Sequence, residues 1–126
     1  MNLDFLPSKV LNAIRSREID DVYEIRLKKG YPTKLTCADK RLNLLKDEFG
    51  GNIVCEKSDI EYVINYVTEN SLYAFNDRIK EGYITTKDGV RIGIAGDCVF
   101  SEDKIVTIKN FSSINVCSFR CSNTIT

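Results

Sequence analysis

The spacing of apolar residues changes at Gly82 from a helical period to an alternating one, and this change limits the folds open to the chain. Before Gly82, apolar residues recur every three or four positions, as they do on the buried side of a helix. This stripe consists of Ile60, Val63, Ile64 and Val67. After Gly82 they recur at every second position, which is typical of strands with one face on a core. The sequence therefore predicts an α+β fold, an antiparallel sheet with helices mainly on one face.

The first half of the chain shows the same two periods in shorter segments. Pro7 suits the first turn of a helix, where its missing N–H costs nothing. Residues 22–27 alternate between apolar and charged side chains, which indicates a strand. The expected elements are a helix from Pro7 to about Arg17, strands over 22–27, 33–37 and 53–55, and a loop or irregular hairpin over 39–51.

Two helices are expected in the middle of the chain. The first begins at a capping box formed by Ser58 and Glu61, whose side chains bind backbone N–H groups of the first turn. The second follows a break at 70–71 and ends at Gly82, because glycine readily takes the left-handed conformation. Its expected inward-facing residues are Leu72, Phe75 and Ile79.

The last third of the chain is expected to form an antiparallel meander, with strands over 83–86, 90–100, 105–108 and 114–119. Asp88 and Gly89 favour a tight hairpin turn between the first two strands. Gly93 and Gly96 lie inside a strand pattern and no helix start follows them, so they do not form a dinucleotide-binding loop. We expect these two glycines at a bulge or at a close backbone approach.

Length and composition predict a single soluble domain. The chain has 126 residues, 43% of them hydrophobic, which is enough for one core. Eighteen basic residues balance eighteen acidic ones, so no overall field attracts nucleic acid or an anionic membrane. The amino terminus has neither a basic start nor a long apolar run. We therefore expect a cytoplasmic protein without a signal peptide or membrane span.

Residue types that carry chemistry are scarce. The chain has no histidine, which excludes serine–histidine and cysteine–histidine nucleophiles, and it has no G-x-x-x-x-G-K-[ST] phosphate-binding loop. The cysteines lack C-x-x-C spacing, so we expect reduced, mostly buried thiols and no metal site. These cysteines are Cys37, Cys55, Cys98, Cys117 and Cys121. The chain is therefore expected to be no enzyme and to hold no cofactor of its own.

One basic segment raises the alternative of a nucleic-acid site. Lys28, Lys29 and Lys34 lie near Tyr31, a combination that occurs in strips binding single strands. Because the chain has no net charge, a solvated loop is the favoured interpretation, and no nucleic-acid partner is expected.

Five segments, in order along the chain, resemble one protein family. They are EIRLKKGYP at 24–32, SLYAF at 71–75, GYIT at 82–85, GVRIGIAG at 89–96 and IKNFSSIN at 108–115. These blocks are similar to those of the stage III sporulation protein AA family, and the resemblance runs from about Leu6 to Asn115. Where that family usually has an arginine two positions after the asparagine, this chain has Cys117.

The resemblance implies that the chain is one part of a larger machine. That family consists of cytoplasmic ATPases of endospore-forming bacteria, related to the motor ATPases of type II and type IV secretion. They act on the mother-cell side of the forespore membrane, with membrane proteins that form a channel-like complex. The resemblance implies one PAS-like amino-terminal domain over 1–120, a tail over 121–126, and a P-loop ATPase domain that this chain lacks. The longer protein would use ATP and Mg²⁺ and form a hexamer.

By the same resemblance, Arg91 is a candidate to contact nucleotide bound by an adjoining ATPase domain. A guanidinium offers a fixed fork of donors to phosphoryl oxygens, whereas the alternative is a solvent-facing strand arginine in a surface ion pair. Glu24 and Arg26 are candidates for an ion pair or a subunit contact, and the Tyr73 hydroxyl for an interface. The remaining motif residues are Phe75, expected in the core, Gly93, Gly96 and Asn115.

These observations predict a non-catalytic assembly and regulatory domain of a sporulation ATPase. Its expected partners are its own ATPase domain, neighbouring subunits and membrane proteins of the channel complex. A small nucleic-acid-binding module and a ligand-sensing module are the alternatives.

Overall fold

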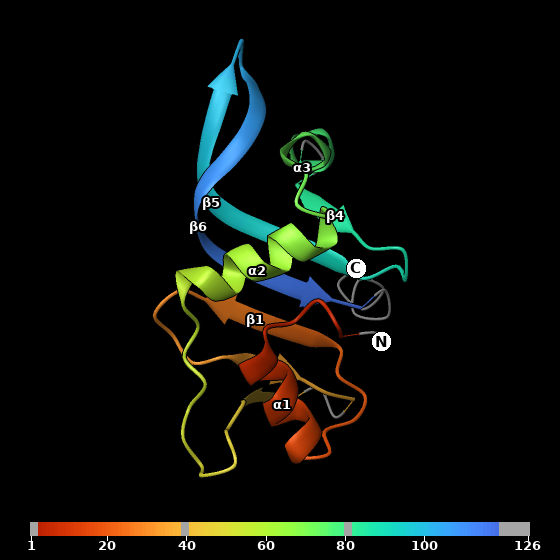
Figure 1. Cartoon of the computed structure of the whole chain (residues 1–126), viewed down its shortest axis with the longest axis vertical. Coiled ribbons are helices and arrows are strands. Elements are labelled where there is room, and N and C mark those ends of the chain that lie inside the picture. The colour runs from red at the N-terminus through yellow and green to blue at the C-terminus, as the bar shows by residue number, and fades with distance from the viewer. Residues whose placement is uncertain (1–2, 39–40, 80–81, 119–126) are drawn as a thin grey trace.

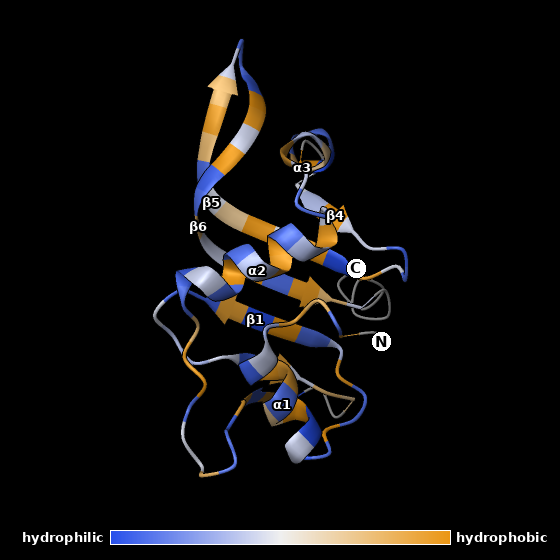
Figure 2. Cartoon of the chain, in the orientation of Figure 1, coloured by the Kyte–Doolittle hydropathy of each residue, from blue (hydrophilic) through white to orange (hydrophobic). Residues whose placement is uncertain are grey.

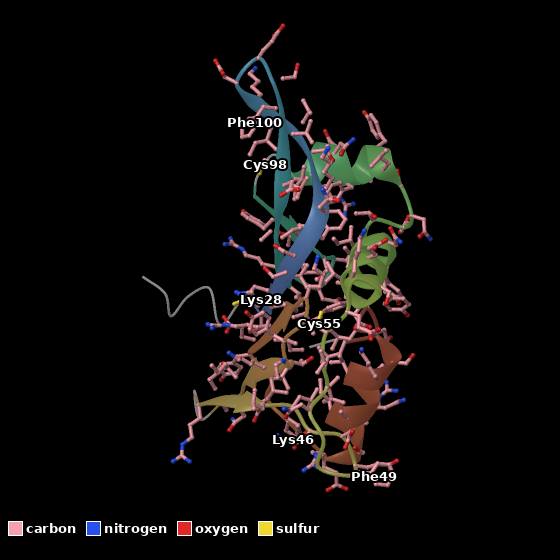
Figure 3. All side chains as sticks on the ribbon, turned by 90° about the vertical axis from the view of Figure 1, so that its left-hand side faces the viewer. Lys28, Lys46, Phe49, Cys55, Cys98 and Phe100 are labelled. Atoms are coloured by element: carbon pink, nitrogen blue, oxygen red, sulfur yellow. The ribbon has the colours of Figure 1, made fainter. Side chains whose placement is uncertain are left out.

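The computed structural model describes residues 3–38, 41–79 and 82–118. Along the chain the elements are α1 (Ser8–Ser16), β1 (Glu24–Lys28), β2 (Lys34–Thr36), β3 (Leu42–Leu44), α2 (Lys57–Val67), α3 (Leu72–Ile79), β4 (Tyr83–Thr85), β5 (Arg91–Ser101) and β6 (Lys104–Cys117). The strands form one antiparallel sheet of six strands in the order β3-β2-β1-β6-β5-β4. The helices lie on the same face of this sheet (Figures 1 and 3). The predicted α+β class is confirmed.

A row of aliphatic residues crosses four strands at the centre of the helix-covered face. The register places Ile25 beside Val116, Val116 beside Ile92, and Ile92 beside Ile84. All four side chains are fully buried. The helices cover this face with Val10, Ala13 and Ile14 from α1, Ile60, Val63 and Ile64 from α2, and Phe75 and Ile79 from α3. Figure 2 shows the resulting contrast between apolar and polar residues along the helices. Removing this apolar surface from water is the main driving force for the fold.

The helices are short. The longest of the three, α2, has 11 residues, whereas crossing a bilayer takes about 20 apolar ones. Within the described ranges, no helix is both long enough and apolar enough to span a membrane.

The capping box predicted from Ser58 and Glu61 is wrong. The N-cap of α2 is Glu56, whose backbone N–H donates to the Asp59 carboxylate at 2.7 Å. The same carboxylate pairs with Lys9 of α1, again at 2.7 Å. This long-range ion pair favours the start at Glu56, and sequence spacing alone cannot reveal it.

Leu72 was expected to face inward and is instead 71% exposed. It is the first residue of α3 and only borders a shallow crevice between α2, α3 and β6. Phe75 and Ile79, one and two turns later, are buried as predicted. The predicted left-handed conformation of Gly82 is also confirmed, with φ of 85°.

One strand of 14 residues, β6, replaces the two strands predicted over 105–108 and 114–119. Asn110 interrupts the alternation with a φ of 52°, yet pairing with β5 resumes on both sides of it. This irregularity explains why the pattern resembled two strands. Phe119 and the predicted tail over 121–126 lie outside the described residues.

The region between β2 and α2 differs from the expected loop followed by a strand. Part of 39–51 forms β3, which pairs with β2 and extends the sheet. Residues 53–55 form no regular strand, and Val54 makes only an isolated bridge with Pro32.

Candidate functional site: the helix-free face of the sheet

Most predicted site residues lie on the sheet face opposite the helices. In β1, Ile25 and Leu27 are buried on the helix side, so the alternate residues Glu24 and Arg26 belong to the other face. Figure 3, seen along the sheet, shows the helices gathered on one side of it. We call the opposite side the helix-free face.

The register aligns these residues in two neighbouring rows. In the first row Glu24 lies beside Cys117, which lies beside Arg91. In the second row Arg26 lies beside Asn115, which lies beside Gly93. Five of the eight predicted site residues are thus brought together from three strands. They are Glu24, Arg26, Arg91, Gly93 and Asn115.

Glu24 is the organising carboxylate of this face. Its side chain is buried, with the residue only 8% exposed. The Arg26 Nε lies 2.6 Å from one carboxylate oxygen, and the Asn115 amide donates to the other at 3.5 Å. A buried carboxylate needs such donors, because an unpaired charge out of water is costly. The predicted pairing of Glu24 with Arg26 is present within the domain.

Arg91 is exposed and is oriented by a neighbouring aromatic ring. Its guanidinium carbon lies 4.7 Å from the centroid of the Tyr83 ring, within the range of a cation–π contact. Tyr83 belongs to β4, which pairs with β5 at this point. The contact with the ring restrains the guanidinium, and because Arg91 is exposed its N–H donors can still reach an anion.

Two lysines add to the positive charge of the face. Lys34 of β2 lies directly beside Arg26 in the register, and like charges in such a pair repel each other. Lys28 follows Arg26 on the same face of β1 and places its ammonium 4.6 Å from the centroid of the Tyr31 ring. At these described positions four cations face one carboxylate, although the whole chain is neutral. The sequence did not place Lys34 and Tyr83 beside the predicted site residues, because strand alternation alone does not show which strands are neighbours.

Three predicted residues lie away from this face. Phe75 is buried against Phe111, with ring centroids 5.7 Å apart in an edge-to-face arrangement, and belongs to the core. Tyr73 is 84% exposed on the first turn of α3. Gly96 lies in β5 where its pairing with β6 becomes irregular.

The cysteines are less uniformly buried than predicted. Cys55 and Cys117 are buried, Cys37 is half-buried, and Cys98 is exposed, while Cys121 lies outside the described residues. Burial, reinforced by the Asp59 carboxylate, raises the pKa of Cys55 to about 11. In the described ranges no three histidine, cysteine or acidic side chains are grouped so that they could hold a metal ion.

Comparison with known proteins places these features in a family. The sequence model of the family described as "Sporulation stage III, protein AA" matches residues 5–124. "Stage III sporulation protein AA" of Bacillus subtilis (strain 168) is 22% identical over 116 residues, which is 90% of this chain. The chain spans 36% of the length of that relative. Because the family match covers the helix-free face and nearly the whole chain, the chain belongs to the stage III sporulation protein AA family.

Proposed function

We propose that this chain is a non-catalytic amino-terminal assembly and regulatory domain of a longer sporulation ATPase. The family match and the partial coverage of a longer relative support this proposal. The sequence has no P-loop, so ATP and Mg²⁺ would bind in a domain beyond this one. In the proposed assembly, a hexamer with a PAS-like amino-terminal domain works with membrane proteins on the mother-cell side of the forespore membrane.

The proposed role of Arg91 is to contact nucleotide held by an adjoining ATPase domain. The observation that supports this role is the exposed Arg91 guanidinium, held in cation–π contact with Tyr83, on a face where cations outnumber carboxylates. Charge grows on the phosphoryl oxygens as the terminal phosphate is transferred, and a positioned arginine stabilises that charge. A preoriented side chain loses less conformational entropy when it makes these hydrogen bonds.

The test is ATP turnover by the full-length protein with Arg91→Ala. If Arg91 contacts the nucleotide, kcat falls by at least about tenfold while the hexamer still assembles, and Arg91→Lys restores little of it. Arg15→Ala is the matched control, because Arg15 is an exposed arginine of α1 on the opposite side of the sheet. Unchanged kcat and unchanged hexamer assembly in Arg91→Ala would contradict the proposed role.

A second candidate, binding of single-stranded nucleic acid, has one specific observation in its favour. The helix-free face presents two cation–aromatic pairs, Lys28 with Tyr31 and Arg91 with Tyr83, and such faces can stack bases and neutralise phosphates. Fluorescence anisotropy with labelled single-stranded DNA and RNA tests it across a salt series. Affinity that falls about 10-fold or more between 50 and 200 mM salt would favour this candidate. No binding at low salt favours the ATPase-domain partner.

A further inference from the structure

The hairpin of β5 and β6 extends well beyond the rest of the sheet (Figure 1). β4 pairs with β5 only at 91–93, and β1 pairs with β6 only at 113–117. We call the extension the arm: residues 94–101 of β5, the turn, and residues 104–112 of β6. Among the described residues, neither outer edge of the arm has a strand partner.

The outer edge of β6 carries features that prevent strand pairing. Between Ala95 and Asp97, β5 advances by two residues while β6 advances by four. Between Val99 and Phe100, β5 advances by one residue while β6 advances by two. Both irregularities therefore insert their extra residues into β6. Bulges and lysines are common means of protecting a sheet edge, and this edge also carries Lys104 and Lys109.

The outer edge of β5 lacks this protection. Its residues 94–101 contain no inserted residue, and their one charged side chain, Asp97, accepts a hydrogen bond from Asn110 at 2.9 Å. Cys98 is exposed, and Phe100 is 61% exposed near the tip. Figure 2 shows apolar residues along the arm almost to its tip, and Figure 3 shows Cys98 and Phe100 on the part of the arm that stands beyond the core. An unprotected apolar edge of this length is a template for another strand.

We propose that this edge pairs with the same edge of a second copy of this chain. The two β5 strands run antiparallel, and Cys98 lies opposite Cys98 of the other copy. Asp97 then lies opposite Val99, Ala95 opposite Ser101, and Phe100 opposite Gly96. The pairing uses the whole free edge of β5, residues 94–101, which runs from the end of its pairing with β4 to the turn.

Charge and shape favour this register over its neighbour. Centring the pair on Asp97 would put two carboxylates opposite each other, which is destabilising in a sheet. Centring it on Cys98 places no like charges opposite one another and sets Phe100 opposite Gly96, a pairing of an aromatic residue with an edge glycine that stabilises sheets. Because the edge is complementary to itself, a second copy is the occupant that it fits. This inference does not depend on the proposed ATPase role.

Sedimentation equilibrium of the 126-residue chain, over a range of concentrations, tests the pairing. The chain is expected to form a dimer reversibly, and Phe100→Lys to raise the dimer Kd by roughly tenfold or more. Val106→Lys is the matched control, because Val106 is an exposed apolar residue of the same arm on β6. A chain that stays monomeric to about 1 mM, or equal effects of the two variants, would overturn the proposal.

Cross-linking of the unmodified chain tests the register without relying on those variants. Diamide takes up two electrons and two protons from a pair of thiols and leaves a disulfide, so it should link the two Cys98 residues in the dimer. Cys98→Ser should abolish the linked dimer. Cys98→Ser combined with Phe100→Cys should not restore it, since the two introduced thiols would lie several residues apart. A parent dimer that diamide does not link, or linkage that returns in the double variant, would refute the Cys98-centred register.

Discussion

Gly96 lies so close to β6 that a Cβ on it would come within 2.8 Å of the Ile108 Cγ2 atom. The added Cβ would also lie 2.8 Å from the Lys109 carbonyl oxygen, which belongs to the backbone and cannot move aside as the end of a side chain can. This contact occurs where β6 carries its extra residues. The expectation of a close approach or bulge is confirmed for Gly96, whereas Gly93 has only an ordinary contact of 3.9 Å.

Gly96→Ala is expected to lower the free energy of unfolding by about 1–3 kcal/mol, the usual cost of overpacking. Gly93→Ala on the same strand is the control and should stay within about 0.5 kcal/mol of the parent chain. Urea denaturation followed by circular dichroism measures both. Equal losses in the two variants would show that strand glycines, and not this contact, matter.

Glu24→Ala is expected to destabilise the domain by about 1–3 kcal/mol, because it removes the acceptor of two hydrogen bonds from a buried position. It also leaves Arg26 beside Lys34 without the carboxylate that offsets their two positive charges. The loss should therefore shrink as NaCl rises, since salt screens that repulsion. Denaturation at low and high salt, with Lys28→Ala as control, tests this. If the loss of stability does not change with salt, repulsion between Arg26 and Lys34 does not contribute to it.

Asp59→Ala should cost about 1–2 kcal/mol, since it removes the carboxylate that accepts from the Glu56 N–H in the capping box of α2, together with the ion pair to Lys9. Ser58→Ala should be neutral within about 0.5 kcal/mol, because Ser58 is not the N-cap. Thermal unfolding of the two variants compares them directly. A larger loss of stability in Ser58→Ala than in Asp59→Ala would instead support the N-cap predicted at Ser58.

Cys55 is expected to react with iodoacetamide at pH 8 at least ~100-fold more slowly than Cys98, because it is buried and its pKa is raised to about 11. Mass spectrometry of timed samples locates the alkylated thiols. Comparable rates at both sites would contradict the burial of Cys55.

The raised pKa of Cys55 also predicts how stability depends on pH. The thiol in the unfolded chain, at its ordinary value of 9.0, loses its proton before the folded one does. Its contribution to stability is therefore complete below pH 9 and is lost as pH rises through 11. Cys55→Ala should lose less stability across this window than the parent chain, as measured by urea denaturation at each pH. Parallel curves would show that other groups account for the loss.

The local periods of the chain were sufficient to predict most elements. The stripe from Ile60 to Ile64 and the alternation around Ile92 each report burial of one face, and that signal lies within a few neighbouring residues. The errors arose where a distant contact decides the outcome. Lys9 favours the start of α2 at Glu56, and pairing with β5 carries β6 through Asn110.

Composition and local pattern encode the α+β class, the lack of a P-loop motif and the family motifs directly, so these could be predicted from the sequence alone. The shared face of Glu24, Arg26, Asn115 and Arg91 depends instead on the order of the strands in the sheet. β1 and β5 are separated in the chain by two helices and lie on either side of β6 in the sheet. The packing of the helices over the aliphatic row decides which strands become neighbours. These contacts join residues far apart in the sequence, so local patterns do not reveal them. The cationic face and the open arm edge both follow from that strand order.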